Sequence, residues 1–150
     1  MTERKRARPD DYFADWKERE ALAEDMIPLV GRLYRKNNVK TYIYGHPLVN
    51  QSLDIMQAHR FVRQVEGNEL SEFETHPVIQ ALAGLNLGTA HIDAGRIAVG
   101  YLESKSELSI EDYVKEQVAD LIDVDPKPIE KPRDVVLYGF GRIGRLMARL

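Results

Sequence analysis

The 150-residue sequence contains no cysteine, which excludes disulfide bonds and thiolate metal sites within it. It has no apolar run near the ~18 residues of a membrane-spanning helix, and no signal-peptide core follows the N-terminus. Neither sign of charge is in large excess, because the formal net charge is −3. That balance argues against a general nucleic-acid binder and against a protein that lies on a membrane surface. We therefore expect a cytoplasmic protein with no nucleic-acid or membrane partner.

Most of the chain repeats apolar residues at three- and four-residue steps, the spacing that predicts amphipathic helices. Hydrophobic residues make up 43% of the sequence, enough for one ordinary domain with a core. Because each segment has a single apolar face, these faces must meet in a shared core. We predict a mainly α fold with a bundle of about five helices, at residues 11–37, 47–66, 71–84, 90–103 and 109–122.

Local signals mark where several of these helices begin and end. Ser71 and Ser109 are each followed three residues later by an acidic residue, so both are expected N-caps. Gly67 is expected to end the second helix. Pro28 interrupts the first helix, where we expect a kink or two abutting helices. Residues 39–44 form a β-rich segment for which the sequence offers no obvious partner strand.

The helical part offers no catalytic set and no metal-binding set that its spacing supports. His59, Arg60 and Arg63 lie close together on the second helix, either as an anion site or as a solvated rim beside the core face. We favour the rim. His91 and Asp93 are two positions apart on a predicted helix, on different faces, so we reject a shared metal ion. Trp16 is predicted to lie in the core.

The composition divides the chain into four parts. Residues 1–10 are polar and basic, and we expect them to form a disordered tail. Residues 11–124 are the helical part. Residues 125–133 contain three prolines among charged residues and are predicted to form an extended linker. Residues 134–150 are predicted to begin a second, incomplete domain.

That last part has the pattern of a dinucleotide-binding βαβ unit of the Rossmann type. Asp134–Tyr138 is a β-rich run that predicts a strand, and apolar residues at helical spacing follow from Ile143. Between them Gly139, Gly141 and Gly144 stand in G-x-G-x-x-G spacing. The first glycine permits the sharp turn, the second lets the backbone approach a pyrophosphate, and the third allows the helix to pack closely. A turn of this kind without a ligand is the alternative.

The run Gly139-Phe-Gly-Arg-Ile-Gly-Arg145 resembles the first Gly-rich turn of glyceraldehyde-3-phosphate dehydrogenases. Tyr138 departs from that family, which usually has Asn before the first glycine. The resemblance implies that the cofactor is NAD or NADP, and that the backbone amides of Arg142 and Ile143 meet its pyrophosphate. The cofactor-binding residues it implies are Gly139, Phe140, Gly141, Arg142, Ile143 and Gly144.

The resemblance also implies a phosphorylating oxidoreductase that converts an aldehyde, NAD(P) and phosphate into an acyl phosphate and NAD(P)H. That chemistry uses a cysteine thiolate, so we expect these residues to be an inactive N-terminal fragment of a longer enzyme. The resemblance further implies a homo-oligomeric parent, a long bacterial form with a helical N-terminal extension. Glycolytic and gluconeogenic roles both stay open. A stand-alone helical interaction or oligomerisation module is the alternative.

Overall fold

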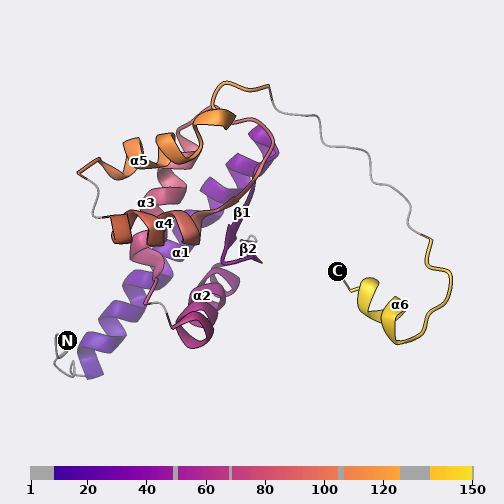
Figure 1. Cartoon of the computed structure of the whole chain (residues 1–150). Helices are drawn as coiled ribbons and strands as arrows, with labels where there is room; N and C mark the ends of the chain where they lie inside the picture. Colours follow the sequence, from indigo (N-terminus) through magenta and orange to yellow (C-terminus); the bar gives the residue numbers. More distant parts are fainter. Residues whose placement is uncertain (1–8, 49–50, 68, 105–106, 126–135, 150) are drawn as a thin grey trace.

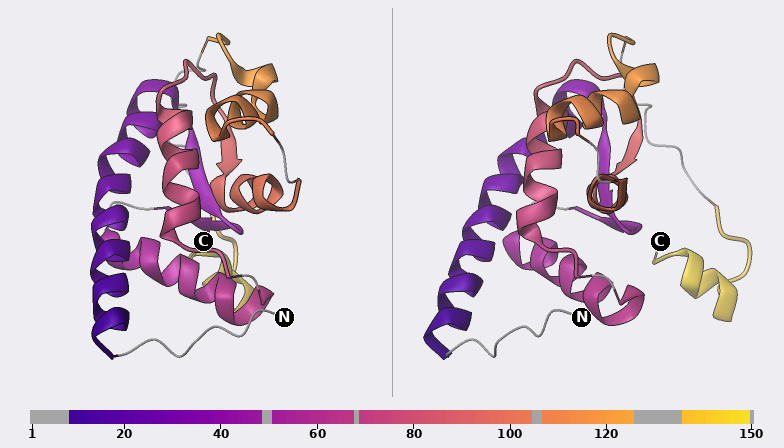
Figure 2. Two further views of the ribbon diagram at one scale, coloured as in Figure 1. Left: turned by 90° about the vertical axis from the view of Figure 1, so that its left-hand side faces the viewer. Right: turned by 60° about the vertical axis from the view of Figure 1, so that its left-hand side comes forward.

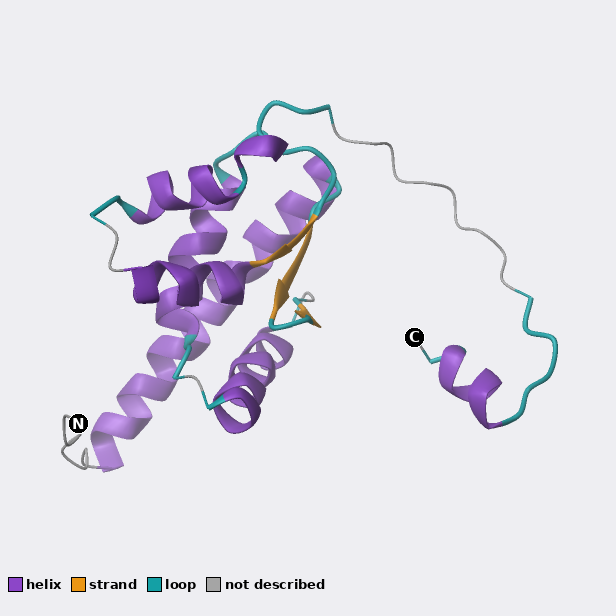
Figure 3. Ribbon diagram, viewed as in Figure 1, coloured by secondary structure: helices purple, strands orange, loops and turns teal. Residues whose placement is uncertain are grey.

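The structure is a computed structural model that describes residues 9–48, 51–67, 69–104, 107–125 and 136–149. Helices predominate in these residues, as the sequence predicts, and a small sheet accompanies them (Figures 1 and 3). The helices are α1 (Pro9–Asn37), α2 (Ser52–Phe61), α3 (Glu72–Ala83), α4 (Ala94–Ser104), α5 (Ile110–Gln117) and α6 (Arg142–Met147), with a π-helical turn η1 (Val62–Glu66) and a 3-10 turn η2 (Ala119–Leu121). The strands are β1 (Lys40–Ile43), β2 (His46–Pro47) and β3 (His91–Asp93).

The long helix α1 forms one side of the molecule and continues through Pro28. It lies beside α3 and is crossed by α2 (Figure 2). Its buried residues fall on both sides of the proline, from Ala23 and Met26 to Val30 and Leu33. We attribute the unbroken helix to this packed face, which offsets the backbone hydrogen bond that Pro28 removes. The expectation of two abutting helices is wrong.

The sheet joins segments that are far apart in the sequence. Its strand order is β2-β1-β3, with β1 antiparallel to β2 and parallel to β3. Thr41 pairs with Ile92. The sequence showed no obvious partner strand for residues 39–44, and the structure shows that β3 is such a partner. Two predicted helices therefore begin later than expected. Pro47 belongs to β2, and β3 replaces the first turn of the helix that was predicted from residue 90.

One hydrophobic core unites α1 to α5 and the sheet. It contains Ile55 and Val62 from the second helix, Val78 and Leu82 from α3, and Val114 from α5. The predicted caps are confirmed at both serines. Ser71 forms a reciprocal capping box with Glu74, and Ser109 accepts a hydrogen bond from the amide of Asp112 at 3.1 Å. Gly67 ends η1 with a left-handed φ of 63°.

The C-terminal segment lies apart from this core (Figure 1). No strand is present among the described residues 136–138, and α6 has no buried residue. A Rossmann-type beginning is therefore not confirmed. Residues 126–133 of the predicted linker and residues 134 and 135 of the predicted strand lie outside the described residues, as do residues 1–8 of the predicted tail. Pro9 and Asp10 belong to α1.

Candidate functional site

The glycine turn before α6 has a defined local geometry. Gly139 has a φ of +96°, a value that residues with a side chain rarely adopt. Gly141 is the N-cap of α6, and its carbonyl accepts a hydrogen bond from the amide of Arg145 at 3.0 Å. A Cβ atom on Gly144 would lie only 2.5 Å from the carbonyl oxygen of Gly139. Gly139 and Gly144 are thus required by the turn itself.

Gly141 differs from the other two glycines because a Cβ atom at this position would meet nothing within 4 Å. The space beside it is open, as it must be if a ligand phosphate approaches the backbone there. Arg142 and Ile143 lie in the first turn of α6, where amide hydrogens have no intrahelical acceptor. The six predicted residues 139–144 therefore form one continuous turn that is open on the side of Gly141.

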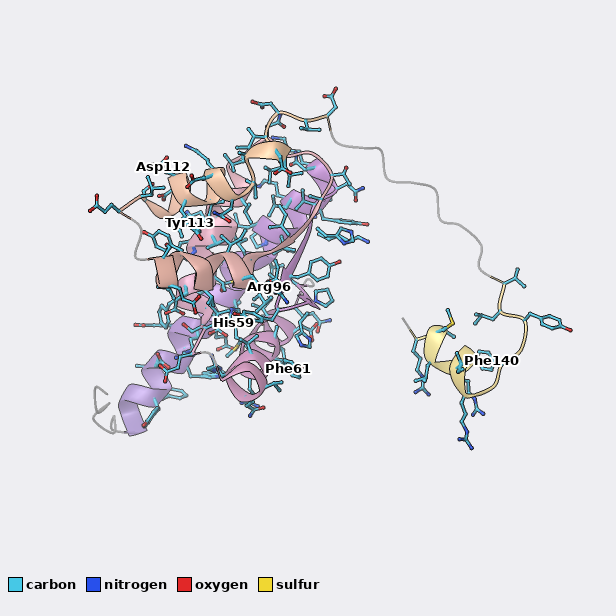
Figure 4. All side chains as sticks on the ribbon, viewed as in Figure 1. His59, Phe61, Arg96, Asp112, Tyr113 and Phe140 are labelled. Carbon is cyan, nitrogen blue, oxygen red and sulfur yellow. The ribbon has the colours of Figure 1, made fainter. Side chains whose placement is uncertain are left out.

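Apolar side chains around this turn are exposed within the described part of the chain. The exposed fraction is 63% for Phe140, 74% for Ile143 and essentially complete for Tyr138. Figure 4 shows Phe140 well away from the side chains of the helical core. Among the described residues of the C-terminal segment, the charged side chains are the three arginines Arg142, Arg145 and Arg149, and Tyr138 carries a phenol that is fully exposed. These described residues therefore supply positive charge beside the turn.

Apart from the glycine turn, a cluster of polar side chains around His59 lies inside the helical core, where the sequence pattern predicted a solvated rim. His59 is fully buried, so that prediction is wrong for this residue. Its Nδ1 lies 2.7 Å from the carbonyl oxygen of Ile55, and its Nε2 lies 2.7 Å from Oγ1 of Thr75. The signal was available, since His59 lies four positions after Ile55 and three before Val62, both apolar and both buried.

Glu72, at the start of α3, is the other buried member of this cluster and was not predicted. Its side chain is 1% exposed, and burial raises its pKa above the ordinary value. Arg19 Nη1 lies 3.7 Å and Arg63 Nη1 4.0 Å from Oε2 of Glu72. His59 Nδ1 approaches Oε1 of Glu72 at 3.5 Å. That approach is not an ion pair at neutral pH, because burial lowers the pKa of His59 to about 4.

His91 and Asp93 lie on a strand, not on a helix, so the predicted separation onto different faces is wrong. Asp93 has a structural role, because its carboxylate accepts hydrogen bonds from the backbone amides of Tyr44 at 3.0 Å and Gly45 at 2.9 Å. These bonds hold the turn between β1 and β2. Among the described residues, no group of three or more His, Cys, Asp or Glu side chains is placed to hold a metal ion.

Trp16 is 45% exposed and stacks on Phe13 with 6.2 Å between ring centroids, so its predicted place in the core is wrong. None of the helices in the described ranges combines the length and the apolar character needed to cross a membrane.

The chain was compared with families of known proteins and with curated proteins. No family profile matches the chain. The chain is 46% identical over 128 residues to a glyceraldehyde-3-phosphate dehydrogenase-like protein of Pseudomonas aeruginosa (strain UCBPP-PA14). The alignment covers 83% of this chain and 28% of the relative, so the chain spans little more than a quarter of that protein's length. An alignment of that extent must include most of the helical part, residues 11–124.

Proposed function

We propose that this chain, a relative of glyceraldehyde-3-phosphate dehydrogenase-like proteins, is the N-terminal part of a phosphorylating oxidoreductase that uses NAD or NADP. The observation that carries the proposal is the glycine turn of residues 139–144. Its spacing, the positive φ of Gly139 and the close approach of Gly144 to Gly139 together suit a dinucleotide-binding turn.

In this proposal the turn receives the pyrophosphate of the cofactor. The open side of Gly141 admits a phosphate oxygen, and the amides of Arg142 and Ile143 donate hydrogen bonds to it. The guanidinium of Arg142 adds positive charge near the same anion. The cofactor, when bound, accepts a hydride from the substrate. The exposed side chains of Tyr138 and Ile143 would be covered by the further strands and helices of a complete Rossmann domain.

The reaction itself needs residues that these 150 do not contain. Oxidation of an aldehyde to an acyl phosphate by this route passes through a thiolate nucleophile, and the chain has no cysteine. We therefore propose that these residues alone are inactive and have no measurable NAD affinity. A titration of the isolated chain that gave micromolar NAD binding would contradict this part of the proposal.

Two substitutions test the turn in the full-length gene product. Gly141→Ala places a methyl group in open space, so the fold should remain while NAD or NADP affinity falls at least tenfold in a calorimetric titration. Gly100→Ala, in the helical core, is the matched control and should leave affinity unchanged. Unaltered affinity in Gly141→Ala would overturn the assignment of the pyrophosphate site. A stop codon directly after the codon for Leu150 would overturn the proposed longer enzyme.

We also propose that the helical part contributes to assembly of a homo-oligomer. Tyr12 and Phe13, on the first turns of α1, are each 59% exposed, which is unusual for adjacent aromatic side chains on a monomer surface. Deleting residues 1–125 from the full-length product and measuring its mass by light scattering tests this role. An unchanged mass would remove it.

A further inference from the structure

A hollow of about 190 Å³ lies between the N-terminal half of α1, the α2 helix and the start of α3. Its polar wall includes Arg60, Arg63 and Glu72, and its apolar wall includes Trp16, Leu53 and Met56. It is separate from the glycine turn of residues 139–144, which lies on the C-terminal segment. The proposed cofactor site therefore does not account for it.

Glu72 brings an unsatisfied acceptor to this hollow. Its side chain is 1% exposed, and neither carboxylate oxygen has a hydrogen-bond partner within the described residues. Arg19 and Arg63 lie 3.7 and 4.0 Å away, too far for hydrogen bonds. A buried acceptor without a partner destabilises a fold, so such groups usually have a ligand or an ordered water beside them.

The cations of the hollow are only partly engaged. Arg60 is exposed and forms no hydrogen bond or ion pair with the described part of the chain. Arg63 has one long hydrogen bond, 3.4 Å to the carbonyl oxygen of Leu70. Arg19 is held by Asp15 at 2.8 Å. Three arginines and two glutamates, Glu20 and Glu72, line the hollow, so its net charge favours an anion.

The spacing of these groups limits what such an anion looks like. Arg63 Nη1 is 4.0 Å from Glu72 Oε2, so a ligand that meets both must carry its anion and its hydrogen-bond donor within two or three bonds of each other. Trp16 and Leu53, which are 45% and 61% exposed, supply an apolar surface beside this pair. A volume of about 190 Å³ is below that of drug-sized ligand sites, so the ligand is small.

We propose that the hollow binds a small carboxylic acid that carries an amino or hydroxyl group on its α-carbon and has an apolar side chain. The ligand carboxylate pairs with Arg60 and Arg63. The α-substituent donates to Glu72, which gives the buried carboxylate the hydrogen-bond donor that it lacks among the described residues. The apolar side chain lies against Trp16, Leu53 and Met56.

Four probes with the same carbon skeleton test each element of this proposal. L-leucine and 2-hydroxy-4-methylpentanoate carry both the carboxylate and a donor, 4-methylpentanoate lacks the donor, and leucinamide lacks the carboxylate. Trp16 is the single tryptophan of the chain and lines the hollow, so its fluorescence reports binding directly. We expect one or both of the first two probes to bind at least tenfold more tightly than either of the others.

Preference for leucine or for its hydroxy analogue identifies the natural substituent as an amine or a hydroxyl. Equal binding of 4-methylpentanoate would overturn the role of Glu72, and equal binding of leucinamide would overturn the arginine site. If no probe binds at ~10 mM, about ten times a Kd of 1 mM, the whole proposal is overturned.

Variants assign the two halves of the site. Arg60→Gln changes an exposed side chain and should weaken leucine binding about tenfold, whereas Arg32→Gln makes the same change on an exposed part of α1 that does not line the hollow. Glu72→Gln removes the negative charge and one of the two acceptor oxygens, so it should reduce the preference for leucine over 4-methylpentanoate while leaving 4-methylpentanoate binding in place. Because Glu72 is buried, the fold of this variant is checked by circular dichroism, and Arg60→Gln decides the proposal if Glu72→Gln does not fold. Equal loss of binding in Arg32→Gln and Arg60→Gln would overturn the site.

Discussion

His59 on α2 and Thr75 on α3 are joined by a hydrogen bond inside the core, with 2.7 Å between Nε2 and Oγ1. The other ring nitrogen lies 2.7 Å from the carbonyl oxygen of Ile55. A carbonyl oxygen can only accept, so Nδ1 carries the proton and donates. The lowered pKa of His59, about 4, keeps the ring neutral at pH 7, so Nε2 accepts. The hydroxyl proton of Thr75 is therefore directed to Nε2 at 2.7 Å, and the carbonyl oxygen of Ser71, 3.2 Å from the same hydroxyl, is the more distant acceptor.

Thr75→Val should lower the free energy of unfolding by about 1–3 kcal/mol, because it leaves the buried Nε2 of His59 without a donor. Thr41→Val is the matched control, since Thr41 is equally buried but its hydroxyl has no hydrogen-bond partner among the described residues. That control should be neutral or slightly stabilising. Urea denaturation of the three proteins measures both effects. Equal losses in the two variants would contradict the role assigned to the His59–Thr75 bond.

The buried His59 predicts that the folded protein is destabilised by mild acid. Its folded pKa of about 4 lies below the ordinary value of 6.5, so between these values the unfolded chain binds a proton that the folded chain does not. The stability that the neutral ring provides is present above pH 6.5 and is lost as the pH falls towards 4, up to about 3 kcal/mol. Glu72 acts in the opposite direction, because its pKa is raised in the folded state and stability increases as the pH falls through that value.

The contribution of His59 is isolated by comparison with His59→Asn. The difference in unfolding free energy between the two proteins should shrink by about 3 kcal/mol from pH 7 to pH 4. An NMR titration of the ring protons of His59 should give a midpoint near pH 4. A midpoint near 6.5 would contradict the burial of the ring in solution.

Two glycines of α4 should respond oppositely to alanine. A Cβ atom on Gly95 would lie 3.0 Å from Cγ2 and 3.2 Å from Cα of Ile43 on β1, so Gly95→Ala should lower stability by about 1–3 kcal/mol. On Gly100 the new atom meets only the hydroxyl of Tyr113, which can move, and the helix gains up to about 1 kcal/mol. Thermal unfolding followed by circular dichroism measures both. Stabilisation by Gly95→Ala would show that α4 does not pack closely on β1.

The sequence signals that proved correct are local ones. Ser71 and Ser109 cap their helices and Gly67 ends η1, because each depends on hydrogen bonds or backbone angles within a few residues. The incorrect predictions depend on distant partners. The apolar spacing around His91 predicted a helix, but this residue belongs to β3. That strand forms through its pairing with β1, about fifty residues earlier, which no local pattern around His91 indicates.

The sequence by itself determined the mainly helical fold, the caps and the glycines of the turn at residues 139–144, because spacing and backbone freedom are properties of the local chain. The resemblance to glyceraldehyde-3-phosphate dehydrogenases likewise came from the sequence alone, and the 46% identical relative, a glyceraldehyde-3-phosphate dehydrogenase-like protein, confirms the family. Only the tertiary structure decided that His59 and Glu72 are buried together and that Trp16 lies at the surface. Burial of a polar group depends on which helices cover it, and the packing of α1 and α3 against α2 is set by contacts far apart in the chain.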